Sequence, residues 1–597
     1  MTAVRLPTVP FALLLLCGLT ISPAYAADGP PDDPSVAAAT SGSDEANPAA
    51  AERPSRPNIL FAFADDWGRY ASAYAALEGD ARNDLSRATG FSTPNFDAIA
   101  GAGVLFTHAY VNAPSCTPCR SSLLTGRPFY TTGLGAILRG AKWDGSIPSY
   151  PEALEADGYR IGYTYKVWSP GQPIDAPFGG RQKGFRSAGS DFNRFSQNVT
   201  AADAPDARAE ELFGQVRDNF RAFLDDESGN DESGEDGASE DEEKPWHYWF
   251  GPTNVHRTWT KGSGQALWGI EPDSLKGKMP PFLPDVPEVR EDFADYLGEV
   301  MAFDAALGVL LDELKERGEL ANTVVVVSGD HGAPGFPRGK TNLYDFGVAV
   351  PLAIAGPGVL AGPDGEGRVV TDFVTLPDLA PTFLDMAGVD RPVGMSARSL
   401  TPILISNEAG RVDEARDASF FGRERHVAVA RDDYLPYPMR GIRTDDYLYI
   451  RNFAPDRWPE GTGPGYGEPG EMPSAEALTN TTRAAFGDVD AGPTKAYVVT
   501  NRDSGSAETS FELGFLKRPA EELYDVKTDP HQMTNLADDP AHAEAKQELS
   551  ERLMRHLKKY DDPRVTGDGS TFDESPYADP AGYERLPDGG VRRTNGR

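Results

Sequence analysis

Two short hydrophobic runs along the chain have the pattern of buried strands. The first runs from Asn58 to Ala64, and the second is the valine run that begins at Thr323 and ends at Ser328. Short runs without alternating polar positions are typical of strands that are covered on both faces of a parallel sheet. We therefore expect both runs to lie inside one sheet.

Two other segments have hydrophobic residues at helical spacing. Thr93 and Pro94 have the pattern of a helix cap followed by a proline at the first helical position. The residues that would then share one face are Phe96, Ile99, Ala100 and Val104. A similar face just before the valine run is formed by Tyr296, Val300, Phe303, Leu307, Leu310 and Leu311. Strands that alternate with helices in this way predict an α/β fold.

The composition is that of a large folded protein with many turns. The chain has 597 residues, of which 39% are hydrophobic and 10% aromatic, and it contains 62 Gly and 50 Pro. This is enough hydrophobic material for one large α/β unit and a smaller one. The formal net charge of −34 excludes a basic nucleic-acid-binding protein.

The N-terminal segment has the features of an export signal. Arg5 precedes an apolar run over residues 11–19, which is too short to span a bilayer, and Ala24 and Ala26 form a small-x-small cleavage pattern. We expect a signal peptide over residues 1–26 and a secreted or periplasmic mature protein without a transmembrane segment. Residues 27–55 lack an apolar period and are expected to form a linker.

A second polar segment interrupts the middle of the chain. Between residues 225 and 243, most positions are acidic and the others are mainly Gly and Ser. The ligand spacing of a calcium-binding loop is missing, so this segment is expected to be a solvated insertion.

Acidic side chains follow directly after both predicted strands. Asp65 and Asp66 come after the first strand, and Asp330 and His331 come after the second. Either pair alone could form a turn or a helix cap. Because ligands of open α/β sheets bind beyond the carboxyl ends of the strands, two such pairs favour a shared site. Three carboxylates packed together repel one another unless a cation neutralises them, which predicts a hard divalent ion, most simply Ca²⁺.

The chain has three cysteines, of which Cys17 lies in the expected signal peptide and would be removed with it. Cys116 and Cys119 have the spacing of a redox pair, of half a zinc site, or of a disulfide across a tight turn. Zinc is disfavoured because no other cysteine would remain in the mature chain. The spacing alone leaves the redox and disulfide interpretations open.

The residues after Cys116 extend this motif. Cys116-x-Pro118-x-Arg120 continues as Ser-x-Leu-x-Thr-Gly-Arg up to Arg127, and this run resembles the motif of the type I, formylglycine-dependent sulfatase family. The resemblance implies an alkaline-phosphatase-like α/β fold with a large, mixed, mostly parallel sheet flanked by helices and a smaller C-terminal α+β domain. We expect a catalytic domain over residues 56–410, the smaller domain over 411–560 and a tail over 561–597.

The resemblance also implies the roles of the motif residues. Cys116 would be converted to formylglycine by a formylglycine-generating enzyme, and the aldehyde hydrate would attack sulfur. Arg120 would brace this hydrate. The ligands of one Ca²⁺ would be Asp65, Asp66, Asp330 and His331.

Three further residues take roles from the same resemblance. Lys166 and Lys340 would bind sulfate oxygens, and His256 would be the candidate general acid beside the leaving atom. The family has a His two residues after this first Lys, where this chain has Trp168. The base that releases sulfate is therefore open, with His108 and His256 among the few candidates.

The C-terminal part resembles the branch that contains the heparan N-sulfatases. In this resemblance Glu424, His426 and Arg440 would line a sugar subsite, although Glu424 and Arg425 could equally form an exposed ion pair. The implied substrate is a sulfated saccharide such as a glycosaminoglycan fragment, cleaved at an S–O or S–N bond. Because the net charge of −34 predicts an acidic surface around a locally positive pocket, we expect attack at chain ends or on short oligosaccharides.

Two other functions remain open. One is a phosphatase or phosphonate hydrolase of the same superfamily, and the other is a non-catalytic glycan-binding protein in which Cys116 stays unmodified.

Overall fold

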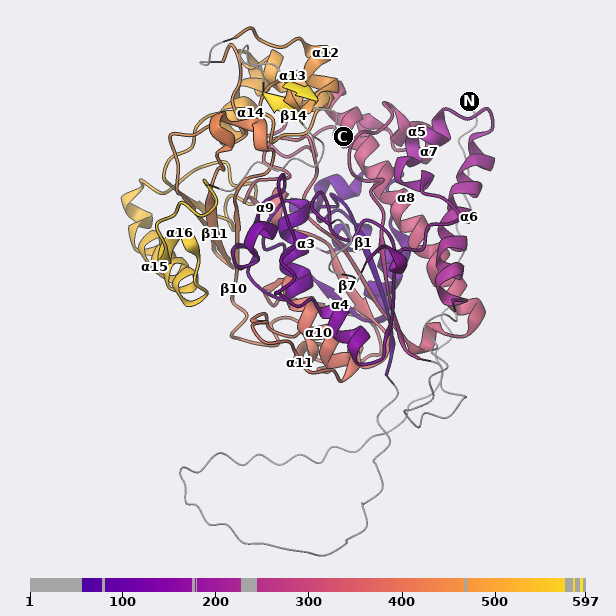
Figure 1. Ribbon diagram of the computed structural model, residues 1–597. Helices are drawn as coiled ribbons and strands as arrows, with labels where there is room; N and C mark the ends of the chain where they lie inside the picture. The colour runs from indigo at the N-terminus through magenta and orange to yellow at the C-terminus, as the bar shows by residue number, and fades with distance from the viewer. Residues whose placement is uncertain are drawn as a thin grey trace, which may run out of the picture. The chain divides into compact units, whose positions relative to one another are not determined.

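A seven-stranded mixed sheet forms the centre of the computed structural model (Figure 1). The structure describes residues 56–77, 81–173, 178, 180–226, 244–466, 470–574, 583–585 and 591–593. The expected signal peptide (1–26), the expected linker (27–55) and residues 227–243 of the expected acidic insertion lie outside the described residues.

The strand order across this sheet is β4-β5-β1-β6-β7-β2-β8. The strands are β1 (Asn58–Ala64), β2 (Val104–Phe106), β4 (Arg160–Tyr165), β5 (Trp246–Gly251), β6 (Thr323–Gly329), β7 (Leu352–Ala355) and β8 (Arg368–Val370). Only β7 runs antiparallel to its neighbours β6 and β2, whereas the other pairs are parallel. The predicted mixed, mostly parallel sheet is confirmed.

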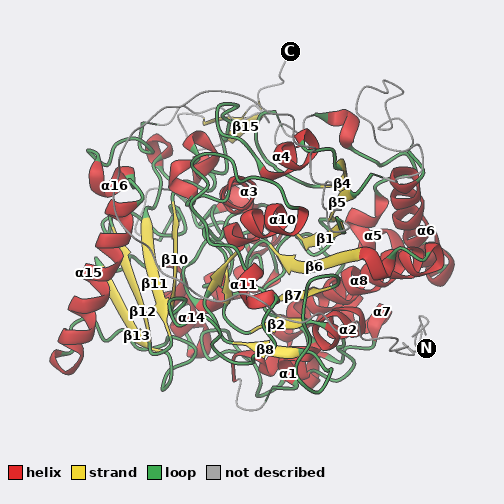
Figure 2. Ribbon diagram, turned by 90° about the horizontal axis from the view of Figure 1, so that it is seen from below, coloured by secondary structure: helices red, strands yellow, loops and turns green. Residues whose placement is uncertain are grey.

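Helices cover both faces of this sheet (Figure 2). Those of the sheet region are α1 (Ser72–Ala75), α2 (Pro94–Ala102), α3 (Cys116–Thr125), α4 (Tyr150–Ala156), α5 (Phe195–Thr200), α6 (Pro205–Leu224), α7 (Ser263–Trp268), α8 (Pro287–Arg317), α9 (Asp345–Val348), α10 (Leu379–Ala387) and α11 (Thr401–Leu404). Helix α8 packs against α2, α6 and α7, and α10 packs against α3 and α4.

Alternation of side chains along the central strands explains the two helical layers. Phe61 of β1 contacts Trp249 of β5 and Phe383 of α10. Phe250, the next residue of β5, points to the opposite face and contacts Phe303 of α8. Both faces are therefore covered, as the unbroken hydrophobic runs require. All seven residues of β1 and of β6 are buried.

The predicted strands and helices are observed, with one correction. Val104, expected on the helix face with Phe96, Ile99 and Ala100, is instead the first residue of β2, because α2 ends at Ala102 and Gly103 after it has non-helical φ and ψ angles of −147° and −117°. The first predicted strand coincides with β1, and the valine run forms β6, which extends one residue further to Gly329. Helix α2 begins at Pro94 with Thr93 as its N-cap, and the long hydrophobic face before β6 belongs to α8.

A second, antiparallel sheet has the strand order β10-β11-β12-β13. Its strands are β10 (Ala418–Arg423), β11 (Met439–Thr444), β12 (Tyr447–Asn452) and β13 (Glu521–Asp525). The helices of this region are α12 (Ala475–Asn480), α13 (Pro493–Thr500), α14 (Gly505–Phe515), α15 (Ala543–Lys559) and α16 (Pro563–Thr566). Helix α15 packs on β11 and β12. This α+β region begins close to the boundary expected near residue 410, and the boundary itself stays a prediction.

Two strand pairs complete the described structure. They are β3 (Ala109–Tyr110) with β9 (Val374–Thr375), and β14 (Tyr583–Arg585) with β15 (Val591–Arg593). Among the described helices, none has both the length and the apolar character that crossing a bilayer requires.

Candidate active site

The ends of β1 and β6 bring the two acidic pairs together. The strands are parallel neighbours with Ala64 opposite Gly329, so Asp65 and Asp330 follow at the same edge of the sheet. The backbone N–H of Asp66 donates to Oδ1 of Asp330 at 2.8 Å. The expected convergence of the two strand ends is therefore observed, while metal binding at this point stays a prediction.

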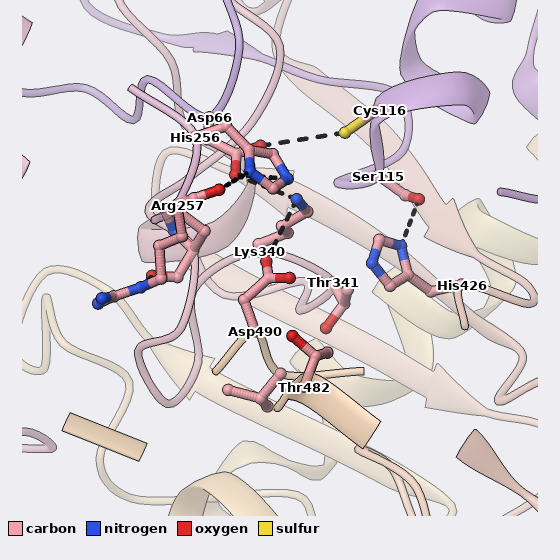
Figure 3. A network of polar contacts seen from close by, with 12 residues as sticks. Asp66, Ser115, Cys116, His256, Arg257, Lys340, Thr341, His426, Thr482 and Asp490 are labelled. Atoms are coloured by element: carbon pink, nitrogen blue, oxygen red, sulfur yellow. Dashed lines mark hydrogen bonds and ion pairs between the residues drawn. The ribbon is translucent and has the colours of Figure 1, made fainter. Parts of the chain in front are cut away.

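Cys116, the first residue of α3, lies at the same edge of the sheet. Its Sγ is 4.0 Å from Oδ1 of Asp66 (Figure 3). The same Sγ is 3.4 Å from Nε2 of His331. Burial, reinforced by Asp65, raises the pKa of the Cys116 thiol to about 12. The unmodified side chain is therefore a neutral thiol and a poor nucleophile at neutral pH.

Cys119 lies one turn further along α3, and both cysteines are buried and free. The disulfide interpretation of this pair is therefore wrong for this structure. A redox role is also disfavoured, because a reactive cysteine needs a lowered pKa, whereas burial raises the pKa of Cys119 well above its ordinary value.

Arg120 pairs with the carboxylates of Asp65 and Asp330. Its side chain is fully buried, and it donates from Nη2 to Oδ1 of Asp65 at 3.1 Å and from Nε to Oδ2 of Asp330 at 3.0 Å. Its Nη1 donates to the carbonyl of Lys166 at 3.0 Å. The structure thus places Arg120 against two expected metal ligands.

Both predicted lysines reach the same carboxylates. Nζ of Lys166, directly after β4, is 2.5 Å from Oδ1 of Asp65. Nζ of Lys340 is 3.0 Å from Oδ2 of Asp66. Together with Arg120, the two lysines supply three positive charges against the carboxylates of Asp65, Asp66 and Asp330. The site therefore consists of closely packed side chains of opposite charge.

The carboxylates of this group have unequal electrostatic environments. Burial acts to raise the pKa of Asp65, but Lys166 and Arg120 hold that pKa well below its ordinary value. Burial raises the pKa of Asp66 to about 7, against the opposing influence of Lys340 and His331. The protein alone therefore stabilises the negative charge of Asp66 less than that of Asp65.

His256 stands at the solvent side of the group, with 32% of its side chain exposed. Its Nε2 is 3.7 Å from Oδ2 of Asp66, and Nδ1 is 2.6 Å from the carbonyl of Arg257. Desolvation and Lys340 lower the pKa of His256 to about 4, so the ring is neutral at neutral pH. Since a carbonyl only accepts, Nδ1 carries the proton and Nε2 is a free base.

Trp168 and His108 do not contact the carboxylates in the way that His256 does. Nε1 of Trp168 donates to Oγ of Ser121 at 2.8 Å, and its side chain is buried. The ring of His108 stacks on Phe373 with centroids 4.6 Å apart. Of the two candidates for the missing base, the structure brings His256 to the carboxylates.

Among the predicted sugar-binding residues, His426 lies beside the nucleophile position. Its Nδ1 is 2.7 Å from Oγ of Ser115, the residue before Cys116 (Figure 3). Burial lowers the pKa of His426 well below its ordinary value, so this ring is neutral as well.

Glu424 and Arg440 instead belong to a closed ionic network. Nη2 of Arg440 is 2.8 Å from Oε1 of Glu424, and its Nε is 2.6 Å from Oδ2 of Asp562. Arg564 pairs with Oε2 of Glu424 at 2.6 Å. The alternative of an exposed Glu424–Arg425 ion pair is wrong, because both side chains are buried. A sugar contact by Glu424 or Arg440 would require this network to open.

Sequence reasoning missed Asp490. Its Oδ2 is 3.3 Å from Nζ of Lys340, although 150 residues separate the two along the chain. No motif or periodic pattern surrounds Asp490 in the sequence, so only the folded structure reveals it. Arg338, two residues before Lys340, stacks on Tyr344, with its Cζ 3.6 Å from the centre of the ring.

Comparison with known families agrees with this geometry. Residues 57–389 match the family described as "Sulfatase", and residues 335–459 match "N-sulphoglucosamine sulphohydrolase, C-terminal". The first match covers more than half of the chain, and this chain belongs to the sulfatase family, the sulfuric ester hydrolases.

Individual relatives give the same result. N-sulphoglucosamine sulphohydrolase from Homo sapiens is 27% identical over 558 residues, which is 88% of this chain and 94% of that protein. An N-acetylglucosamine-6-O-sulfatase from Bacteroides thetaiotaomicron is 25% identical over 484 residues, 68% of this chain and 80% of that protein.

Solved structures show the same fold at low identity. A protein in complex with its substrate D-glucosamine-2-N,6-O-disulfate has a TM-score of 0.54 and 18% identity, over 86% of this chain and 100% of that one. A phosphonate monoester hydrolase of Agrobacterium radiobacter has a TM-score of 0.52 and 17% identity, over 91% and 100% of the two chains. The predicted sulfatase fold is confirmed.

Proposed function

We propose that this protein is an exported sulfatase that removes sulfate from glucosamine-containing saccharides, through Cys116 converted to formylglycine and one bound Ca²⁺. The observation that carries the proposal is the position of Cys116, whose Sγ lies within 4.0 Å of both His331 and Asp66 at the joint edge of β1 and β6. Formylglycine supplies a geminal diol where the buried thiol would be inert.

The donor set fits a calcium ion. Asp65, Asp66 and Asp330 offer carboxylate oxygens, the ligands that calcium prefers, and His331 offers Nε2. Small groups of these residues and Cys116 have potential ligand atoms within 4.8 Å of one another. A divalent ion would also lower the raised pKa of Asp66, because its positive charge opposes the effect of burial. When bound, it would polarise a sulfate oxygen.

Calcium binding can be measured by thermal stability, without an activity assay. Adding Ca²⁺ to chelator-treated protein is expected to raise the melting temperature, because a ligand that binds only the folded state stabilises it. Asp66→Asn should abolish most of this shift. A shift of equal size in wild type and Asp66→Asn would contradict the proposed ligand set.

The chain's own residues then have defined tasks. Lys166 and Lys340 present ammonium groups that neutralise sulfate oxygens. Arg120 fixes the orientation of Asp65 and Asp330. His256 can accept a proton at Nε2 from water at the open side of the site and donate it to the leaving atom, a role that its tautomer and its position both support.

The substrate class rests on the C-terminal match and on relatives whose names include glucosamine sulfates. The test is sulfate release from N-sulfoglucosamine and from glucosamine 6-sulfate by protein co-expressed with a formylglycine-generating enzyme. We expect release by the wild type and background release by Cys116→Ala. Faster turnover of phosphate monoesters than of both sulfates would instead support the phosphatase alternative.

A further inference from the structure

Asp490 lies at the mouth of the site and comes from outside both family matches. It belongs to the segment between β12 and β13, whereas the two matches end at residues 389 and 459. Figure 3 shows Lys340 between Asp66 and Asp490, with ion-pair distances of 3.0 and 3.3 Å. Exposed fractions of 16% for Asp490, 32% for His256 and 4% for Lys340 place the first two on the solvent side.

Asp490 adds a negative charge that the sulfate pocket does not need. Burial acts to raise the pKa of Asp490, but the ammonium group of Lys340 holds it below its ordinary value, so the side chain is an anion. Within the described part of the chain, Asp490 has one ion-pair partner, Lys340, which also pairs with Asp66. Oδ2 of Asp490 is buried and faces Lys340, so the exposed part of the side chain belongs to its other atoms and Oδ1 is the oxygen left to accept from a further donor.

The loop that carries Asp490 is held firmly. Oδ2 of Asp488, two residues earlier, is 2.7 Å from Nη2 of Arg431. The N–H of Ala491 donates to Oγ1 of Thr482 at 3.0 Å, and Nζ of Lys495 donates to the carbonyl of Val489 at 2.8 Å. A group fixed in this way can discriminate between ligands, because it cannot move away from an unfavourable one.

We propose that Asp490 determines which substituent is accepted beside the scissile sulfate group, an inference that rests on the proposed sulfatase function. Asp490 accepts a hydrogen bond from a neighbouring hydroxyl or N–H of the sugar. It repels a second sulfate or a carboxylate at the same position, because like charges brought together in a partly desolvated site are strongly disfavoured.

Matched substrates test this role. The pairs are N-sulfoglucosamine with and without a 3-O-sulfate, and glucosamine 6-sulfate with and without a 4-O-sulfate. The quantity is the ratio of kcat/KM for the substrate without the extra sulfate to that with it. We expect wild type to prefer the former, and Asp490→Asn to lower the ratio at least about 10-fold.

Two further variants test whether the ratio depends on the charge at position 490 in particular. Asp490→Glu keeps the charge and should keep the preference. Asp503→Asn removes a charge from the same segment at a side chain that is 84% exposed, and should leave the ratio unchanged. If Asp490→Asn lowers kcat/KM equally for both members of a pair, Asp490 only positions Lys340 and the proposal is overturned.

Binding separates this proposal from the proposed function. In a Cys116→Ala background, calorimetric Kd values for the same pairs should show the same preference and its loss in Asp490→Asn. If wild type releases no sulfate while this preference is present, the catalytic proposal fails and the role of Asp490 stands. Equal affinity of Cys116→Ala for both members of each pair overturns the role of Asp490.

Discussion

At the scale of single residues, Arg120 stabilises the cluster of buried carboxylates. One guanidinium, with no exposed surface, pairs with Asp65 and Asp330 at the ends of two different strands. Both carboxylates have side chains no more than 2% exposed. Removing this guanidinium would take away the cation that joins the two carboxylates, and would leave Asp65 with Lys166 alone.

We expect Arg120→Met to destabilise the fold by about 3–5 kcal/mol, the usual cost of breaking a buried ion pair from one side. Urea unfolding measures this loss. Arg391→Met is the matched control, because Arg391 pairs with Asp385 at a site where its side chain is 43% exposed. The control should change stability by no more than about 1 kcal/mol. Equal effects of the two substitutions would contradict the structural role of Arg120.

At the scale of elements, strand ends could be read from the sequence and loop contacts could not. The runs that form β1 and β6 are hydrophobic enough to predict two buried strands, and the polar residues directly after them follow from the topology of parallel sheets. Asp490 and Asp488 lie in a Gly-rich stretch without periodicity, and their partners are distant in sequence. Nothing local distinguishes them from surface acids.

Lys495 stabilises that loop from within. Its Nζ donates to the carbonyls of Thr482, Phe486 and Val489 at 2.8–3.2 Å. Burial lowers the pKa of Lys495 to about 7 from an ordinary value of 10.5. The unfolded chain therefore keeps this proton over the window from pH 7 to about 10.5 while the folded protein loses it, and stability rises with pH in this window.

The resulting prediction compares wild type with Lys495→Met. The difference in free energy of unfolding between them should grow in favour of wild type by about 2 kcal/mol from pH 7 to pH 9. Urea titrations at the two pH values measure it. Lys261→Met, at a side chain that is 72% exposed, should show no such growth. A constant difference would mean that Lys495 keeps its proton in the folded protein.

At the scale of the whole described structure, the C-terminal residues close a network that the sequence did not reveal. Residues predicted to line a sugar subsite, Glu424 and Arg440, are tied to Asp562 and Arg564 near the end of the chain. The resemblance of a short motif assigned them a role, but burial and pairing depend on the full fold. The family and the meeting of the two acidic pairs could be predicted because their residues form short continuous motifs.

Asp562 is therefore expected to matter for stability. Asp562→Asn leaves Arg440 with one buried carboxylate in place of two and should cost about 3–5 kcal/mol, seen as a lower thermal midpoint. Asp568→Asn, six residues further along, should leave the midpoint unchanged, because Asp568 is exposed. An unchanged midpoint for Asp562→Asn would show that the C-terminal residues do not hold Arg440 in place.

The most direct test of the whole account is the mass of the peptide that contains Cys116, from protein that releases sulfate. The account predicts an aldehyde at this position, with the thiol sulfur replaced by oxygen. An intact thiol at Cys116 in a preparation with full sulfatase activity would contradict it.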